Sequence, residues 1–139
     1  MTTIYKENTA KVIINEQHSI MPYQREVLDS FYEDMNIETE ELVKVPADGW
    51  TIKQQIEFMK SLRNETVIFI SPIPFMIKEL SISAAKHEIW SAHDDINEYF
   101  YNDYFVYNVF VMANDTRTKK ELPNGKIIST VAETGWYIA

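Results

Sequence analysis

The chain has 139 residues, 45% of them hydrophobic, which is enough to fill the core of one domain. The absence of cysteine excludes disulfides, zinc–thiolate sites and thiol nucleophiles. A formal net charge of −8 opposes binding to long nucleic acid, because such binding neutralises many phosphates with lysine and arginine. The chain shows neither a signal-peptide pattern nor an apolar run long enough to span a bilayer, so we expect a cytoplasmic protein without membrane association.

The first third of the chain predicts a strand, a helix and a second strand. Residues 11–15 (KVIIN) are typical of a short buried strand. Residues 20–35 then show apolar positions at helical spacing, with Ser19 as the expected N-cap and Pro22 in the first turn. Residues 41–46 (ELVKVP) predict the second strand.

The middle of the chain continues this alternation. Thr51 and Gln54 fit a capping box at the start of a second helix, whose apolar stripe is Ile52, Ile56, Met59 and Leu62. Residues 66–70 (TVIFI) are apolar or β-branched throughout, as in a central parallel strand covered on both faces. A third helix is expected over residues 73–84, with Pro74 in its first turn.

The last third predicts strands. Residues 89–104 mix charges and aromatics without a clean period, so we expect irregular structure or a short extra helix there. Residues 105–112 (FVYNVFVM) return to strand character. Residues 118–122 and 126–132 flank Pro123-Asn124-Gly125, and Asn-Gly tolerates the positive φ angles of a tight hairpin turn. A final strand is expected over residues 136–139.

This order of elements predicts an α/β fold. Strands that alternate with helices favour a parallel sheet with helices on both faces. We therefore expect one three-layer, Rossmann-like nucleotide-binding domain over residues 1–139. The fourth strand and the C-terminal antiparallel β-hairpin are expected to extend the mostly parallel sheet.

Polar residues follow three of the predicted strands. They occupy residues 16–19, 71–74 and 114–120. In an open parallel sheet these loops meet at the carboxyl ends of the strands, where ligands bind, and helix N-termini there favour an anion. The alternative interpretation is that these are ordinary loop residues and that Ser19 only caps a helix.

Other types of site are less well supported by the sequence. The three histidines, His18, His87 and His93, lack the spacing of metal ligands, and Asp94-Asp95 is more typical of a solvated acidic turn, so no metal or cofactor is expected. No GxSxG, Walker A or GxGxxG motif is present, and three glycines cannot build a phosphate cradle. The aromatic residues between positions 99 and 107 favour core and interface packing over the stacking of bases.

Three segments resemble small CRISPR-associated Rossmann-like proteins that are related to CARF domains and include standalone ring nucleases. These segments are "NEQH" with the following Gln24, the strand and loop "FISPIPFM", and the tail "VFVMANDTRTKKELPNGKIISTVAETGWYIA". The prolines of the second segment depart from the glycine-containing phosphate loop expected there. The resemblance implies binding of a cyclic oligoadenylate, followed by its cleavage to linear products with a 2′,3′-cyclic phosphate.

Cleavage of this kind needs no metal, because a ribose 2′-OH held in line attacks the adjacent phosphorus while cations stabilise the added charge. The catalytic candidates are His18, which can transfer a proton because imidazole titrates near neutral pH, and the cations Arg117 and Lys120. The candidate ligand-binding residues supply hydrogen bonds or charge, and they are Gln17, Ser19, Gln24, Ser71, Asn114 and Lys119.

Three functions remain open at this point. The first is a ring nuclease, the second is a protein that sequesters the same nucleotide without cleaving it, and the third is an acidic interaction or inhibitor module. For the first two we expect a homodimer with the ligand on its two-fold axis, because a ring with an even number of units has matching symmetry. The aromatic stretch at residues 99–107 would then lie in the dimer interface.

Overall fold

The computed structural model describes residues 8–90, 104–114, 118–130 and 134–139. Most of the segment for which irregular structure was expected, residues 91–103, lies outside them. The elements are β1 (Thr9–Asn15), α1 (Pro22–Met35), β2 (Thr39–Val45), α2 (Ile52–Lys60), β3 (Glu65–Phe69), α3 (Pro74–Trp90), β4 (Val106–Asn114), β5 (Thr118–Glu121), β6 (Ile127–Thr130) and β7 (Trp136–Ile138).

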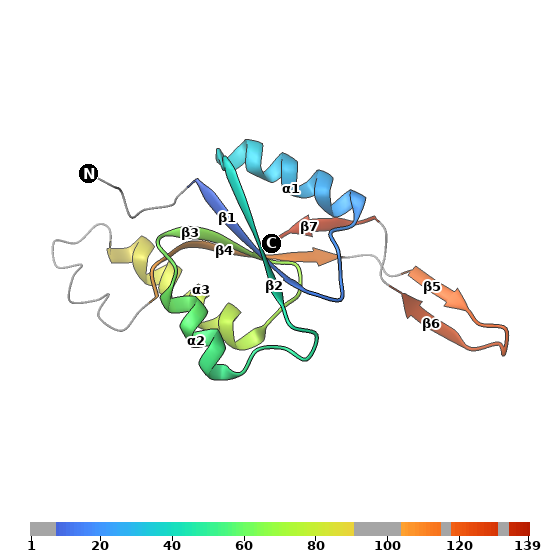
Figure 1. Cartoon of the computed structure of the whole chain (residues 1–139). Coiled ribbons are helices and arrows are strands. Elements are labelled where there is room, and N and C mark those ends of the chain that lie inside the picture. Colours follow the sequence, from blue (N-terminus) through green and yellow to red (C-terminus); the bar gives the residue numbers. More distant parts are fainter. Residues whose placement is uncertain (1–7, 91–103, 115–117, 131–133) are drawn as a thin grey trace.

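The main sheet has the strand order β2-β1-β3-β4-β7 (Figure 1). Strand β1 is parallel to both β2 and β3, and β3 is parallel to β4. The edge strand β7 is antiparallel to β4, with Met112 opposite Ile138 and Asn114 opposite Trp136. The predicted α/β, Rossmann-like fold with a mostly parallel sheet is therefore confirmed.

Helices cover both faces of this sheet (Figure 1). On one face, Leu28 of α1 packs against Val12 and Ile68. On the other face, Met59 of α2 and Met76 of α3 pack in a cluster whose other buried members are Ile13, Val45, Leu62, Val67, Phe69, Leu80 and Val106. Every residue of β3 is buried, as expected for a central strand, and this includes Glu65, which precedes the run predicted at residues 66–70.

The expectation that the hairpin extends the sheet is wrong. Strands β5 and β6 pair with each other in a separate two-stranded sheet, which protrudes from the main body (Figure 1). The antiparallel edge is formed by β7 instead. Within the hairpin turn only Gly125 has a positive φ, of 84°, and its N–H donates to Leu122 O at 2.9 Å. The turn is thus a type I turn closed by glycine, in which Asn124 keeps a negative φ.

Two helix ends also differ from the sequence prediction. Ser19 is not the N-cap of α1, because Met21 occupies that position and its N–H donates to Gln24 Oε1 at 2.9 Å. Gln24, the third helical residue, thus makes the half of a capping box that binds the N-cap N–H, while a methionine stands where serine or threonine is usual. Helix α3 also continues to Trp90, beyond its predicted end at residue 84. The capping box of α2 is confirmed, since Thr51 Oγ1 accepts from Gln54 N at 3.2 Å.

No helix in the described part of the chain is long and apolar enough to cross a membrane.

Candidate functional site

The strand order changes direction between β1 and β3. The connection from β1 runs through α1 on one face of the sheet, and the connection from β3 runs through α3 on the other (Figure 1). The two loops diverge at their carboxyl ends, and ligands of open α/β sheets bind in the crevice that results. A cavity of about 540 Å³ lies at this position, within the size range of small-molecule sites. We call it the β1–β3 pocket; its lining is Asn15, Gln17, His18, Ser19, Met21, Gln24, Ile70, Ser71, Pro72 and Trp136.

The loop after β1 is held by Asn15. Its side-chain oxygen accepts from Gln17 N at 2.9 Å, and its carbonyl oxygen accepts from His18 N at 2.9 Å. Its amide nitrogen donates to Ala47 O at 3.3 Å, across the loop that follows β2. Glu16 strengthens the same link, because its Oε1 accepts from Ala47 N at 2.9 Å. The backbone carrying Gln17 and His18 is therefore fixed although both side chains are exposed.

The loop after β3 is fixed to β1 at its first two residues. The N–H groups of Ile70 and Ser71 donate to Ile13 O at 2.9 and 3.1 Å. The hydroxyl oxygen of Ser71 accepts from Asn15 N at 2.8 Å. Since an accepting hydroxyl keeps its own proton, Ser71 can still donate a hydrogen bond to a ligand. The two loops of the pocket thus form one connected unit.

Gln24 contributes from the first turn of α1 and is only 4% exposed. Its capping hydrogen bond to Met21 N occupies the amide oxygen and not the Nε2 donors. The N-terminus of α1 adjoins the pocket at this turn, and the partial positive charge of a helix N-terminus attracts anions. Amide donors and a helix terminus together favour a phosphate or carboxylate group.

Five of the residues selected from the sequence lie together in this pocket: Gln17, His18, Ser19, Gln24 and Ser71. Three of the other four, Asn114, Lys119 and Lys120, are not among its described lining residues. Asn114, at the end of β4, donates from Nδ2 to Thr134 O at 2.9 Å and is not among the lining residues. Lys119 and Lys120 lie on β5 of the protruding hairpin, and Arg117 lies outside the described residues.

Of the five lining residues that the sequence analysis did not select, Asn15 and Trp136 carry side chains that can interact with a polar or aromatic ligand. Asn15 ends β1, and its position directly before the polar loop was the available signal. Trp136 reaches the pocket from β7, which no parallel-strand pattern could indicate, because its place depends on antiparallel pairing with β4. An indole ring at a pocket of this kind offers a surface on which a nucleobase can stack.

The described lining carries little formal charge. His18 is its one titratable side chain, and it includes neither lysine nor arginine. Within the described residues, no group of three or more His, Asp or Glu side chains is placed to hold a metal ion. Recognition in this pocket therefore relies on hydrogen-bond donors, the α1 N-terminus and the Trp136 ring.

No protein-family model, curated protein or solved structure matches this chain.

Proposed function

We propose that the β1–β3 pocket binds a nucleotide phosphate, and that the ligand is the cyclic oligoadenylate implied by the resemblance to CARF-related proteins. One observation supports this most strongly. Four polar residues from two separate loops, together with Gln24 from the first turn of α1, line one pocket at the point where ligands of this fold class bind. The amide of Gln24, the hydroxyl of Ser71 and the α1 N-terminus supply donors for phosphate oxygens, and Trp136 supplies a surface for adenine.

Cleavage is the second part of the proposal. The 2′-oxygen of one ribose attacks the adjacent phosphorus, the bond from phosphorus to the 5′-oxygen breaks, and a 2′,3′-cyclic phosphate and a 5′-hydroxyl form. His18 transfers the proton between these oxygens. Arg117 remains the proposed cationic partner, because Lys120 lies on the protruding hairpin and not at the pocket. Binding has the stronger support of the two, because the described lining of the pocket offers His18 alone for acid–base chemistry.

The test of binding is a thermal-shift panel of cyclic di-, tri-, tetra- and hexa-adenylates. A ligand that binds only the folded state raises the melting temperature, by an amount that grows with its concentration. We expect at least one ring to do so. Melting temperatures unchanged by every ring would contradict the proposal and favour the acidic interaction module.

The test of cleavage uses the ring that binds best. The protein is incubated with excess ring and denatured, and the products are separated by chromatography. Linear oligoadenylate with a cyclic phosphate end supports the ring nuclease, and its formation should stop in His18→Ala. If only intact ring is recovered, the protein sequesters its ligand.

A further inference from the structure

The β5–β6 hairpin pairs with no other element of the main sheet in the described part of the chain. Its strands pair with each other and belong to no other sheet, and they extend away from the main body (Figure 1). Ile127 of this hairpin is 66% exposed. An isolated two-stranded hairpin is only marginally stable in water. Burial of its apolar side chains against another surface would stabilise it.

A groove with a matching surface runs between α1 and β7. It has a volume of about 370 Å³ and is lined by Tyr23, Glu26, Val27, Ser30, Phe31, Asp34, Trp136, Tyr137 and Ile138. Tyr23 and Tyr137 are 38% and 46% exposed, which is high for such large side chains. We call this surface the α1–β7 groove. It offers aromatic contact area to an apolar partner.

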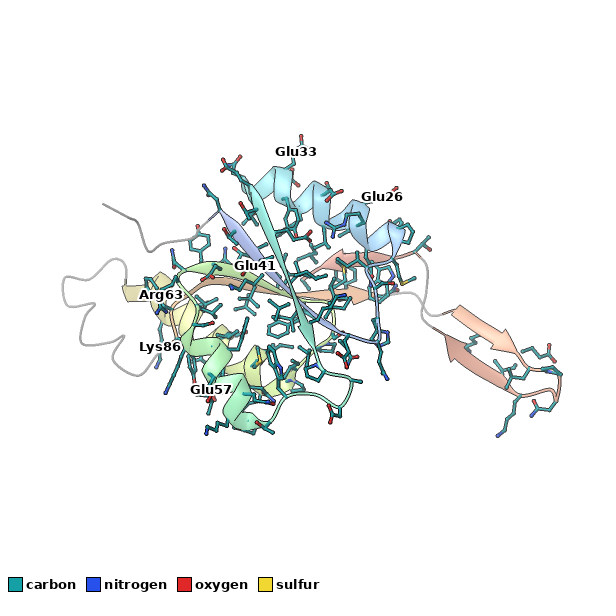
Figure 2. The ribbon with its side chains drawn as sticks, in the orientation of Figure 1. Glu26, Glu33, Glu41, Glu57, Arg63 and Lys86 are labelled. Atoms are coloured by element: carbon teal, nitrogen blue, oxygen red, sulfur yellow. The ribbon has the colours of Figure 1, made fainter. Side chains whose placement is uncertain are left out.

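The hairpin and the groove carry opposite charges. Residues 118–130 contain three lysines and one glutamate, a formal charge of +2 in a chain whose total is −8. The side chains of Lys119 and Lys126 are exposed. The charged lining residues of the groove are both acidic, Glu26 and Asp34, and Figure 2 shows Glu26 extending from α1. Complementary charge of this kind selects a partner and speeds its association.

We propose that the β5–β6 hairpin of one copy docks in the α1–β7 groove of a second copy, and that the exchange is reciprocal. A two-fold dimer of this type contains two hairpins and two grooves, so each apolar and charged surface is covered once. Ile127 packs against the groove aromatics, while Lys119 and Lys126 face Glu26 and Asp34. A second copy is the occupant because both complementary surfaces belong to this chain. This dimer does not depend on any ligand.

The first test is molar mass by light scattering together with charge reversal. The wild-type chain should be a dimer. The pair Lys119→Glu and Lys126→Glu should raise the dimer dissociation constant roughly tenfold or more, as should the pair Glu26→Lys and Asp34→Lys, because like charges then face each other. A chain with all four changes should dimerise again. The matched control is the pair Lys53→Glu and Lys60→Glu, exposed residues of α2, which should leave the mass unchanged.

A monomeric wild-type chain would overturn the proposal. So would a dimer that ignores both reversals, or a fourfold variant that stays monomeric.

The second test identifies whose groove is occupied. Because the chain has no cysteine, single cysteines can be introduced without background. Ile127→Cys and Ser30→Cys are made in separate chains, mixed and oxidised. A disulfide-linked pair containing one chain of each kind is expected. If that pair fails to form, while a chain carrying both cysteines closes a bond within itself, the hairpin docks in its own groove and the exchange is wrong.

Discussion

The hydroxyl oxygen of Ser71 accepts a 2.8 Å hydrogen bond from the backbone N–H of Asn15, and this bond ties the loop after β3 to the last residue of β1. Asn15 in turn accepts from the N–H groups of Gln17 and His18. The serine hydroxyl therefore adds a side-chain link to the backbone hydrogen bonds that Ile70 and Ser71 donate to Ile13 O. Ser71, which looks like an ordinary loop residue in the sequence, therefore helps to hold the two loops of the pocket together.

Ser71→Ala is expected to reduce the free energy of unfolding by about 1 kcal/mol, because the N–H of Asn15 loses its acceptor. Ser71→Thr keeps a hydroxyl at the same carbon and should lose less. Urea denaturation of the three proteins measures the difference. Equal stability of the alanine variant and the wild type would show that water replaces this hydroxyl and that its hydrogen bond to Asn15 contributes little.

Tyr32 should make stability depend on pH above the neutral range. Its hydroxyl donates to Glu40 Oε1 at 2.7 Å and thereby joins α1 to β2. Burial, and then the hydrogen bond and negative charge of Glu40, raise the pKa of Tyr32 well above its ordinary value of 10.0. The folded chain thus holds this proton more tightly than the unfolded chain does. The resulting stabilisation is fully present below about pH 10 and is lost as the pH rises beyond that value.

The variant Tyr32→Phe tests whether the contribution of Tyr32 to stability falls as the pH rises. At pH 7 it should be less stable than the wild type by about 1 kcal/mol, the typical contribution of a partly exposed hydrogen bond. Above pH 10 the difference should shrink, because the wild type alone loses the contribution of Tyr32. Denaturation curves at pH 7, 9 and 10.5 measure it. A stability difference between the two proteins that stays constant or grows with pH would contradict the raised pKa of Tyr32.

Gly125→Val should disrupt the hairpin and leave the main sheet intact. Gly125 has a φ of 84°, which a β-branched residue adopts at considerable cost. Because β5 and β6 form their own sheet, the strain acts locally. Hydrogen exchange should be faster at the β5 and β6 amides and unchanged in β1 and β3. Gly125→Asn is the control, since asparagine tolerates positive φ better. Protection of the hairpin amides that survives Gly125→Val would argue against the turn described above.

Trp136 should report ligand binding directly. If adenine stacks on its ring, cyclic oligoadenylate should change tryptophan fluorescence, and Trp136→Leu should weaken binding roughly 5- to 150-fold, from about 1–3 kcal/mol per stacked base. Trp50 serves as the control, because it is not among the residues that line the pocket and its ring centroid lies 5.3 Å from that of Phe58. Trp50→Phe should therefore leave the fluorescence response in place. A response that disappears with Trp50 and persists without Trp136 would place the base elsewhere.

The sequence was sufficient to predict the parts of the fold that depend on local patterns. The apolar and β-branched run at residues 66–70 predicted a central strand, and Thr51 with Gln54 predicted the start of α2. The N-terminus of α1 was misplaced because the N-cap is Met21, which is not a typical capping residue, and its N–H is bound by the buried Gln24. The separation of the hairpin from the main sheet was also missed, since an Asn-Gly turn shows that two strands pair with each other but not whether they join a larger sheet.

The candidate site divides in the same way. Gln17, Ser19 and Ser71 could be grouped from the sequence because parallel topology brings the loops after β1 and β3 to one edge. Trp136 could not, because its position depends on tertiary pairing of the final strand with β4. The basic residues of β5 were assigned to the same edge because they follow the predicted fourth strand. In the structure they belong to β5, which pairs with β6 in a separate sheet that protrudes from the main body (Figure 1).

The most direct test of the β1–β3 pocket uses two glutamines with the same structural role. Gln24 and Gln54 each accept a 2.9 Å hydrogen bond from the N–H of their helix N-cap residue, Met21 and Thr51 respectively, but only Gln24 is among the residues that line the pocket. Glutamate keeps the accepting oxygen in a capping box and is compatible with the dipole of a helix N-terminus. It removes the amide donor and adds a negative charge that repels phosphate.

The measurement is a calorimetric titration of cyclic tetra-adenylate into the wild type, Gln24→Glu and Gln54→Glu, each first shown to be folded by its melting curve. We expect the wild type and Gln54→Glu to bind with similar affinity and Gln24→Glu to bind at least tenfold more weakly. Half a ligand per chain would support a site on the two-fold axis. Equal affinity in all three proteins, or no heat of binding in the wild type, would contradict the assignment of the β1–β3 pocket as the site for this ligand.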